Sequence, residues 1–564
     1  MLIFFALLTA CTGQPTTMAP TGITKSSEPT QTIPPTAKPL PTSTVTPEPL
    51  NLYLSEPLPE GLVDPNLIDI PFSGNPDAPL WFGPLEEAPD GHIRHTAVQI
   101  YALAAPFPTL RDEIRQADLQ AFWQGDWNEN ASSPTRLYVP GTIEGMLSLR
   151  WGARDATMVT VYDDLPNPQD LWDENAWIIL PFTALSPRLK VMGVDGISPL
   201  NKNFNADDYA LTIRYVLVQN QRTVSIPDNI LQTLIDAVQP TNRDPEKMTS
   251  LVMTGVTALV RATAYKMETK GILYPGEEIV HWLSDADLTH ISNEVSFYEG
   301  CPFPDPNNTM LFFCSNPDYI ELLDYVGADI IELTGNHNND AKYVYGQDVV
   351  PFTLNLYEQH DMAYFGGGLD LAEAKSPLLM THNGNPLAFI GCNAPGPDFA
   401  WATEEQGGAA PCGDYQWMMD EISRLSAEGY LPIATFQYYE DYYNFAGEHH
   451  IRDFGRMAQA GAVIVNGSQA HRPKAMAFEK ETFIDYGLGN LFFDQMGILD
   501  QYGNPVNQTR WEIIQRHTFY DGRHLSTELL TAMLEDFAQP RPMTQNERLI
   551  FLEELFSASG WKSR

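Results

Sequence analysis

The chain has 564 residues, of which 33 are Lys or Arg and 72 are Asp or Glu, so its formal net charge is −39 at pH 7. This length is too great for one ordinary core, and we expect two folded domains together with tails. A surface this acidic repels nucleic acid and anionic lipid headgroups, and the sequence has no run of basic residues to offset the repulsion. Nucleic-acid binding is therefore excluded.

The N-terminus contains a candidate targeting signal. Residues 2–10 are apolar and end at Cys11, and LTAC at residues 8–11 fits a bacterial lipobox, in which the cysteine is lipidated. The apolar stretch is far too short to span a bilayer as a helix. Residues 12–50 are rich in Thr, Pro and Ser and have no apolar period, which predicts a semi-extended, disordered tether. We therefore expect a lipoprotein on the extracellular or periplasmic face of the cell membrane, attached through its lipid anchor only.

Four further cysteines follow in the chain, namely Cys301, Cys314, Cys392 and Cys412. An even number suits an oxidising compartment and predicts two disulfides. Proximity in sequence favours pairing Cys301 with Cys314 and Cys392 with Cys412, although four cysteines allow three pairings. The sequence has neither a CxxC motif nor the Cys/His spacing of a zinc knuckle.

Residues 51–245 are expected to form an N-terminal α/β domain. Residues 108–125 and 142–152 have the apolar spacing of amphipathic helices. Residues 177–182 and 209–218 are apolar runs that predict strands.

The run LSPRLKVMGVDGISPLNKNFNADDYALTIRYVLV, which begins at Leu185, closes this domain. It resembles the closing part of a type 2 periplasmic substrate-binding domain of the phosphate-binding sort, where the chain crosses back between two lobes. The resemblance is short, and an unrelated α/β domain explains the run equally well.

From residue 247 the pattern changes to alternating strands and helices. The expected strands are 251–256, 288–292, 329–335, 386–392, 431–436 and 462–467. Such alternation predicts an α/β domain over residues 247–564 with a largely parallel, buried core sheet. Functional sites in such folds lie at the carboxyl ends of the strands.

Amide, imidazole and carboxylate side chains follow several of these strands. They are Asn293 and Glu294, then Asn336, His337 and Asp340, then Gln437 and Glu440, and finally Gln469, His471, Tyr486 and Asn490. Converging Asn, His and Glu ligands suit a divalent cation, and two such cations can hold a phosphoryl group and supply hydroxide at neutral pH. The alternative is that His337 and His471 are ordinary loop histidines and Glu294 a surface carboxylate. The aromatic residues within 438–445 are expected to pack, and His449 and His450 to begin a helix in solvent.

The order and the amino-acid sequences of these segments resemble those of the CapA family of capsule proteins, a branch of the calcineurin-like metallophosphoesterases. GNHNND at 335–340, GGGLDLAEA at 366–374 and YGLGNLFFD at 486–494 correspond to the family's NNHxxDxG, GGGxxxxeA and YSLGNFxFD. The resemblance implies a metallophosphoesterase-like, layered αββα fold for residues 247–564.

The chain also departs from the family's pattern. Val256 stands where the family has its opening aspartate, Gln437 replaces the histidine of HWG, and Ser468 and Gln469 replace the first histidines of GHHPH. The resemblance leaves four metal ligands, namely Glu294, Asn336, His337 and His471, with His337 the best candidate for a general acid. It implies supporting or substrate-binding roles for Gln437, Glu440, Gln469 and Asn490. A site with this reduced set would bind Mn or Zn weakly or not at all.

The resemblance implies a cell-surface protein in the synthesis, export or anchoring of poly-γ-glutamate capsule or a related envelope polymer. Its partners would be that anionic polymer or the capsule machinery. The missing ligands favour a member without full catalytic activity. Two alternatives stay open: an active metal-dependent phosphoesterase or hydrolase at the envelope, and a solute-binding lipoprotein that acts through residues 51–245.

Overall fold

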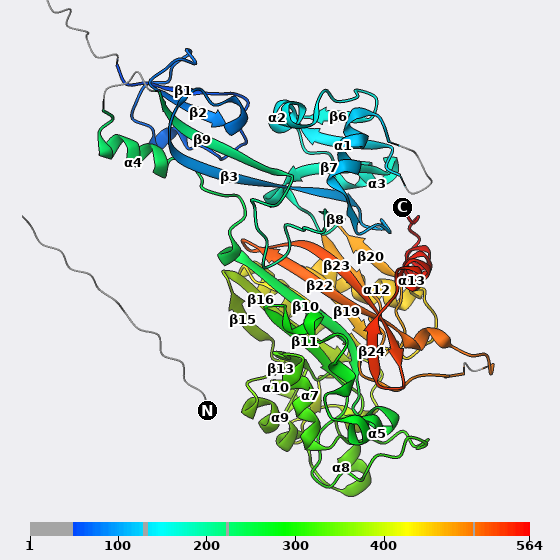
Figure 1. The fold of residues 1–564 in the computed structure, drawn as a ribbon. Helices are drawn as coiled ribbons and strands as arrows, with labels where there is room; N and C mark the ends of the chain where they lie inside the picture. The colour runs from blue at the N-terminus through cyan, green and yellow to red at the C-terminus, as the bar shows by residue number, and fades with distance from the viewer. Residues whose placement is uncertain (1–48, 128–132, 221–224, 500–501) are drawn as a thin grey trace, which may run out of the picture. The chain divides into compact units, whose positions relative to one another are not determined.

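The computed structural model describes residues 49–564 apart from 128–132, 221–224 and 500–501 (Figure 1). The expected lipidation site at Cys11 and residues 12–48 of the expected tether lie outside the described residues. Within the described part of the chain, no helix is both long and apolar enough to cross a membrane.

A nine-stranded mixed sheet uses residues 52–220 (Figure 1). Its main path is β1-β2-β9-β3-β7-β5-β6, and β8 pairs with both β3 and β4. The strands are β1 (Leu52–Leu54), β2 (Leu80–Pro84), β3 (Gly91–Pro106), β4 (Glu113–Ile114), β5 (Arg136–Pro140), β6 (Val159–Tyr162), β7 (Ala176–Pro181), β8 (Leu189–Val194) and β9 (Thr212–Asn220). The helices of this segment are α1 (Gln116–Gln124), α2 (Gly141–Trp151), α3 (Pro168–Glu174) and α4 (Asp228–Asp236). The strands predicted over 177–182 and 209–218 are thus confirmed as β7 and β9.

The helix predicted over 108–125 is wrong in its first half, because α1 begins only at Gln116. The preceding residues form β4, which pairs with β8, and Asp112 accepts hydrogen bonds from the Arg548 side chain. Partners from distant parts of the chain therefore override the local apolar spacing here. The helix predicted over 142–152 is confirmed as α2.

Two further large sheets use residues 248–542 (Figure 1). The seven-stranded sheet has the order β13-β12-β11-β10-β22-β23-β24, in which β10 to β13 are parallel. Its strands are β10 (Met248–Thr257), β11 (Leu288–Asn293), β12 (Ile330–Glu332), β13 (Ala363–Phe365), β22 (Trp511–Tyr520), β23 (Arg523–Glu535) and β24 (Gln539–Pro542).

The six-stranded sheet has the order β15-β16-β18-β19-β21-β20. Its strands are β15 (Leu378–His382), β16 (Asn385–Asn393), β18 (Leu431–Gln437), β19 (Ile464–Ser468), β20 (Met476–Glu479) and β21 (Thr482–Asp485), while β14 (Gly367–Gly368) pairs with β17 (Gly408–Ala409). The helices of this half are α5 (Arg261–Lys270), α6 (Val280–Ser284), α7 (Ile320–Tyr325), α8 (Asp340–Tyr345), α9 (Val350–Gln359), α10 (Leu371–Ala374), α11 (Gln416–Ala427), α12 (Glu448–Ala460) and α13 (Gln545–Ala558).

The two sheets pack face to face, with helices on their outer faces. Leu251 and Met253 of β10 share a core cluster with Phe389 of β16, while Val252 between them packs with Leu322 of α7. This division follows from strand geometry, because successive side chains point to opposite faces of a sheet. The second sheet repeats the pattern, since Phe436 of β18 joins a cluster with residues of α11 and α12. The predicted layered αββα arrangement is confirmed.

Both predicted disulfides are confirmed. The Cα atoms are 5.8 Å apart in Cys301–Cys314 and 5.0 Å apart in Cys392–Cys412. The first closes a loop between β11 and α7, and the second fastens the end of β16 to the segment before α11.

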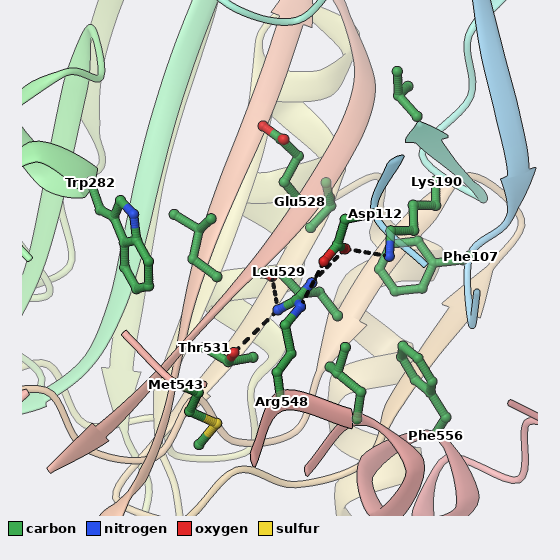
Figure 2. A pocket seen from close by; sticks show the side chains of 14 residues that line it. Phe107, Asp112, Lys190, Trp282, Glu528, Leu529, Thr531, Met543, Arg548 and Phe556 are labelled. Carbon is green, nitrogen blue, oxygen red and sulfur yellow. Dashed lines mark hydrogen bonds and ion pairs between the residues drawn. The ribbon is translucent and has the colours of Figure 1, made fainter. Parts of the chain in front are cut away.

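A cavity of about 330 Å³ is lined by side chains from the N-terminal segment, residues 107–191, and from the later segment, residues 282–556 (Figure 2). Figure 2 shows Asp112 between Lys190 and Arg548, with Asp112 Oδ1 2.6 Å from Lys190 Nζ and 2.8 Å from an Arg548 nitrogen. Burial raises the pKa of Asp112, but these two cations outweigh it and hold the pKa at about 2. The polar groups in this cavity therefore bond mainly to one another, and they link the N-terminal sheet to α13.

Candidate functional site

The sequence-predicted site residues lie at the carboxyl ends of parallel strands. Glu294 follows β11, Asn336 and His337 follow β12, Gln437 ends β18, and His471 follows β19. Loops at this edge of an α/β sheet face outward together, which is why such edges carry functional sites.

A cavity of about 310 Å³ opens at these loops. Seven of the predicted residues line it, namely Glu294, Asn336, His337, Asp340, Glu440, Gln469 and His471. Gln437 lies beside the cavity and contacts two of its lining residues. Asn490 is buried and hydrogen-bonds to His471, which lines the cavity.

Gly335 allows the His337 loop to approach Glu294. A Cβ atom at Gly335 would lie 2.5 Å from the Glu294 Cα, so only glycine fits at this crossing. The approach brings His337 Nε2 to 3.8 Å from Glu294 Oε1.

His337 is oriented by a carboxylate. Its Nδ1 lies 2.6 Å from Asp340 Oδ2, which also accepts a hydrogen bond from the backbone N of Phe313. Because a carboxylate only accepts, Nδ1 carries the proton and Nε2 faces Glu294. Burial lowers the pKa of His337, but the hydrogen bond to Asp340 and the charge of Glu294 outweigh it and raise the pKa.

His471 is held in the same way by an amide. Its Nδ1 lies 2.9 Å from Asn490 Oδ1, while Asn490 Nδ2 donates to the backbone oxygen of His471. Asn490 Oδ1 therefore accepts from Nδ1, and this hydrogen bond fixes the orientation of the His471 ring. The backbone at His471 has φ +52° and at Gln469 φ +76°, so this loop is held in the left-handed region that side chains other than glycine rarely adopt.

Glu294 is one of the polar groups of the site that lack a hydrogen-bond partner. Its side chain is 2% exposed, and its Oε2 is buried without a hydrogen-bond partner. Burial raises the pKa of Glu294, more than the nearby His337 and His471 lower it. A buried carboxylate oxygen without a donor is the kind of group that a cation or a ligand hydrogen would satisfy.

The predicted ligands line one cavity, but their ligand atoms are not all close enough to one another to hold a single metal ion. Among the described residues, the only group of three or more His, Cys, Asp or Glu side chains whose ligand atoms lie within 4.8 Å of one another is Asp441, His449 and His450. Glu294, His337 and His471 are therefore spread more widely than one coordination sphere requires. Of the predicted ligands, Glu294 and His337 lie close enough together to hold one cation between them.

Val256, Gln437 and Ser468, at which the resemblance predicted replaced ligands, make other contacts in the structure. Val256 is fully buried in an apolar cluster with Phe313 and Phe493, which also line the cavity. The amide of Gln437 donates from Nε2 to Asn336 Oδ1 at 3.0 Å and to Glu294 Oε1 at 3.4 Å. Ser468 donates to Gln437 Oε1 at 2.8 Å and fixes that orientation.

Sequence reasoning missed Arg261, which lines the cavity. Its backbone has φ +44°, and its guanidinium lies 5.1 Å from the centres of both the Phe313 and Phe493 rings. It pairs with Asp494 at 2.5 Å, and its Nε is buried without a partner. Its place at the start of α5, directly after the loop that follows β10, was the available signal, because other site residues also follow strand ends.

The C-terminal half of the chain is similar to known proteins. The model of the bacterial capsule synthesis protein family PGA_cap matches residues 250–495, which include every residue of the cavity. This domain belongs to the PGA_cap family.

The curated relatives of the PGA_cap domain are capsule proteins. The chain is 23% identical over 270 residues to "Capsule biosynthesis protein CapA" of Bacillus anthracis, covering 46% of this chain and 63% of that protein. It is 25% identical over 183 residues to "PGA biosynthesis protein CapA" of Bacillus subtilis, covering 32% of this chain and 47% of that protein. The chain thus spans less than two thirds of the length of either relative.

A solved 5′-nucleotidase precursor from Thermus thermophilus is also similar, at 12% identity, a TM-score of 0.28 and coverage of 55% of this chain and 59% of that one. At so low a score the likeness says nothing of what the PGA_cap domain binds.

Proposed function

We propose that this chain binds an anionic envelope polymer in the strand-end cavity of its PGA_cap domain. There it would serve the synthesis, export or anchoring of poly-γ-glutamate capsule or a related polymer, without hydrolysis by a two-metal mechanism. The observation that carries the proposal is the amide of Gln437, which donates hydrogen bonds to Asn336 and Glu294.

The Gln437 contacts favour binding over two-metal catalysis. A two-metal centre needs carboxylate, amide and imidazole donors free to face two cations. Here Asn336 Oδ1 and Glu294 Oε1 already accept from Gln437, and Val256 offers no donor atom. One divalent cation, held by Glu294 and His337, would supply positive charge to an anionic ligand.

The cavity brings one arginine and two histidines together with three carboxylates, those of Glu294, Asp340 and Glu440. With a net charge of −39, most of the surface repels a polyanion. Arg261 and the two histidines bring cationic or neutral donors to the cavity. An anionic chain would therefore make its cationic contact at Arg261, and a divalent cation held by Glu294 and His337 would offset the carboxylates.

The binding test uses fluorescently labelled poly-γ-glutamate and the full chain, with Mn²⁺ or with a chelator. We expect saturable binding that Arg261→Ala weakens at least tenfold. Arg424→Ala removes an exposed arginine of α11 and serves as the charge-matched control, with binding unchanged. If the parent chain does not bind, or both variants bind equally, the proposal fails.

A second candidate is an active hydrolase, favoured by the His337–Asp340 pair. A carboxylate-oriented imidazole at a cavity is a common general acid. Hydrolysis of bis(p-nitrophenyl) phosphate with Mn²⁺, lost in His337→Ala, would establish this candidate in place of the first.

We further propose that lipidation of Cys11 anchors the chain to the cell membrane. The LTAC string and the Pro/Thr-rich stretch after it support this. Metabolic labelling with a fatty acid should mark the parent chain and not Cys11→Ser, and equal labelling of both would disprove it.

A further inference from the structure

Three potential metal ligands meet outside the cavity, at the start of α12. They are Asp441, from the loop after β18, and His449 and His450, the second and third residues of the helix. One ligand atom from each lies within 4.8 Å of the other two. The residues assigned to the family's site do not include any of these three.

His450 is buried, contrary to the expectation that both histidines lie in solvent. Only 1% of its surface is exposed, and its ring packs 4.8 Å from Tyr438 and 6.1 Å from Phe454. Its Nδ1 is buried without a hydrogen-bond partner, and its Nε2 lies 3.8 Å from Asp441 Oδ2. A buried imidazole of this kind costs free energy unless a ligand satisfies it.

The two imidazoles face a common space beside Gly447. A Cβ atom at this position would lie 3.1 Å from His449 Nδ1 and 3.6 Å from His450 Nδ1. Glycine is therefore needed to leave room between the rings, and the Nδ1 atoms of both histidines lie close to the same point.

Asp441 presents one oxygen to this cluster and uses the other elsewhere. Its Oδ1 accepts hydrogen bonds from the Lys474 ammonium and from the backbone N of Tyr443. Its Oδ2 is the oxygen that faces His450. Ligating carboxylates are commonly fixed by hydrogen bonds to their second oxygen, so this arrangement suits a monodentate ligand.

Two positive charges oppose a cation here, namely Lys474 and the N-terminus of α12. Lys474 is 1% exposed and bonded to Asp441. The acidic side chains of Glu448, in the first turn of the helix, and of Asp441 offset them. Because Lys474 is bonded to Asp441, we expect its positive charge to lower the affinity of these three residues for a cation.

We propose that Asp441, His449 and His450 bind one divalent transition-metal cation, of which zinc is the best match. Two imidazoles and one carboxylate form a typical zinc ligand set that leaves a coordination position open. The cation fastens the loop between β18 and α12 to the helix, and this loop carries Glu440 of the cavity. The site is independent of Glu294 and His337 and does not rest on the proposed polymer binding.

The test is calorimetric titration of the full chain with Zn²⁺ alone, followed by visible absorption with Co²⁺ as a spectroscopic substitute. We expect His450→Ala and His449→Ala each to lose one equivalent that His337→Ala keeps. Circular dichroism checks that His450→Ala is folded, and His449→Ala supplies the same test at a position outside the buried core.

Lys474→Met provides the matched control, because it breaks the ion pair with Asp441 and leaves all three ligands. We expect it to retain the equivalent and to bind Zn²⁺ more tightly than the parent chain. The proposal is overturned if the His449 and His450 variants bind as much Zn²⁺ as the parent, or if the only equivalent is the one lost in His337→Ala.

Discussion

Replacing Glu294 by Gln removes a buried negative charge from the candidate site while preserving the shape of the side chain. Glu294 is 2% exposed, Oε2 has no hydrogen-bond partner, and burial raises its pKa. An unsatisfied buried polar group costs about 1–3 kcal/mol. The neutral amide keeps part of that cost, so we expect Glu294→Gln to increase the free energy of unfolding by about 1–2 kcal/mol in the presence of a chelator.

The direction of the pH dependence follows from the raised pKa. Between the unfolded and the folded pKa of Glu294, the folded chain binds more protons than the unfolded chain, so stability falls as pH rises. The gain from Glu294→Gln is therefore expected to be larger at pH 8 than at pH 4, because the cost of ionising the buried carboxyl rises with pH above the usual glutamate pKa.

The assay is urea unfolding of the full chain at both pH values, with and without Mn²⁺. Glu440→Gln is the control, because Glu440 also lines the cavity but is exposed, and we expect a change within about 0.5 kcal/mol. A metal that binds the folded chain stabilises it, and Glu294→Gln should lose that effect. A variant that is less stable than the parent at pH 8 under chelation, or that keeps the full Mn²⁺ effect, would refute the reasoning.

Three more predictions concern other positions. Asp485 is fully buried and its pKa is raised to about 7 by burial, so stability should fall by about 1.4 kcal/mol per pH unit between about pH 4 and 7; Asp485→Asn should flatten this slope in urea titrations, and an unchanged slope contradicts the assignment. Replacing Cys301 and Cys314 together by Ser opens a loop with a sequence separation of 13 and should lower the free energy of unfolding by about 3 kcal/mol; the same assay under reducing conditions should show no difference between variant and parent. Val256→Asp places a charge in an apolar cluster and should lower stability by about 3–5 kcal/mol under chelation, with partial recovery in Mn²⁺, whereas no recovery would mean that the restored aspartate does not reach a cation.

The layered fold of residues 248–542 was predictable because six of its strands read as apolar runs of strand length, followed by polar or glycine-containing loops; these are β10, β11, β12, β16, β18 and β19. The disulfide pairs were also favoured by sequence, since each closes a short loop. That α1 begins only at Gln116 was not predictable, because the residues before it pair with distant parts of the chain. The pairing of β4 with β8 and the ion pairs of Asp112 depend on residues far along the sequence.

The candidate site divides in the same way. The sequence identified the strand-end residues, because polar side chains after buried strands are rare enough to stand out. It did not reveal Arg261, whose neighbours Phe313, Phe493 and Asp494 come from distant segments. Nor did it reveal that His450 is buried, because its packing partners include Tyr486, which belongs to a later segment of the chain.

By itself, the sequence determined where six strands of residues 248–542 lie and which polar side chains follow them, because these properties depend on local pattern. Only the tertiary structure decided that Gln437 bonds to Asn336 and Glu294, that Oε2 of Glu294 has no partner, and that Asp441 meets the two histidines of α12. Those outcomes depend on how loops from different strands approach one another, and that approach is set by packing between sheets and helices rather than by any one segment.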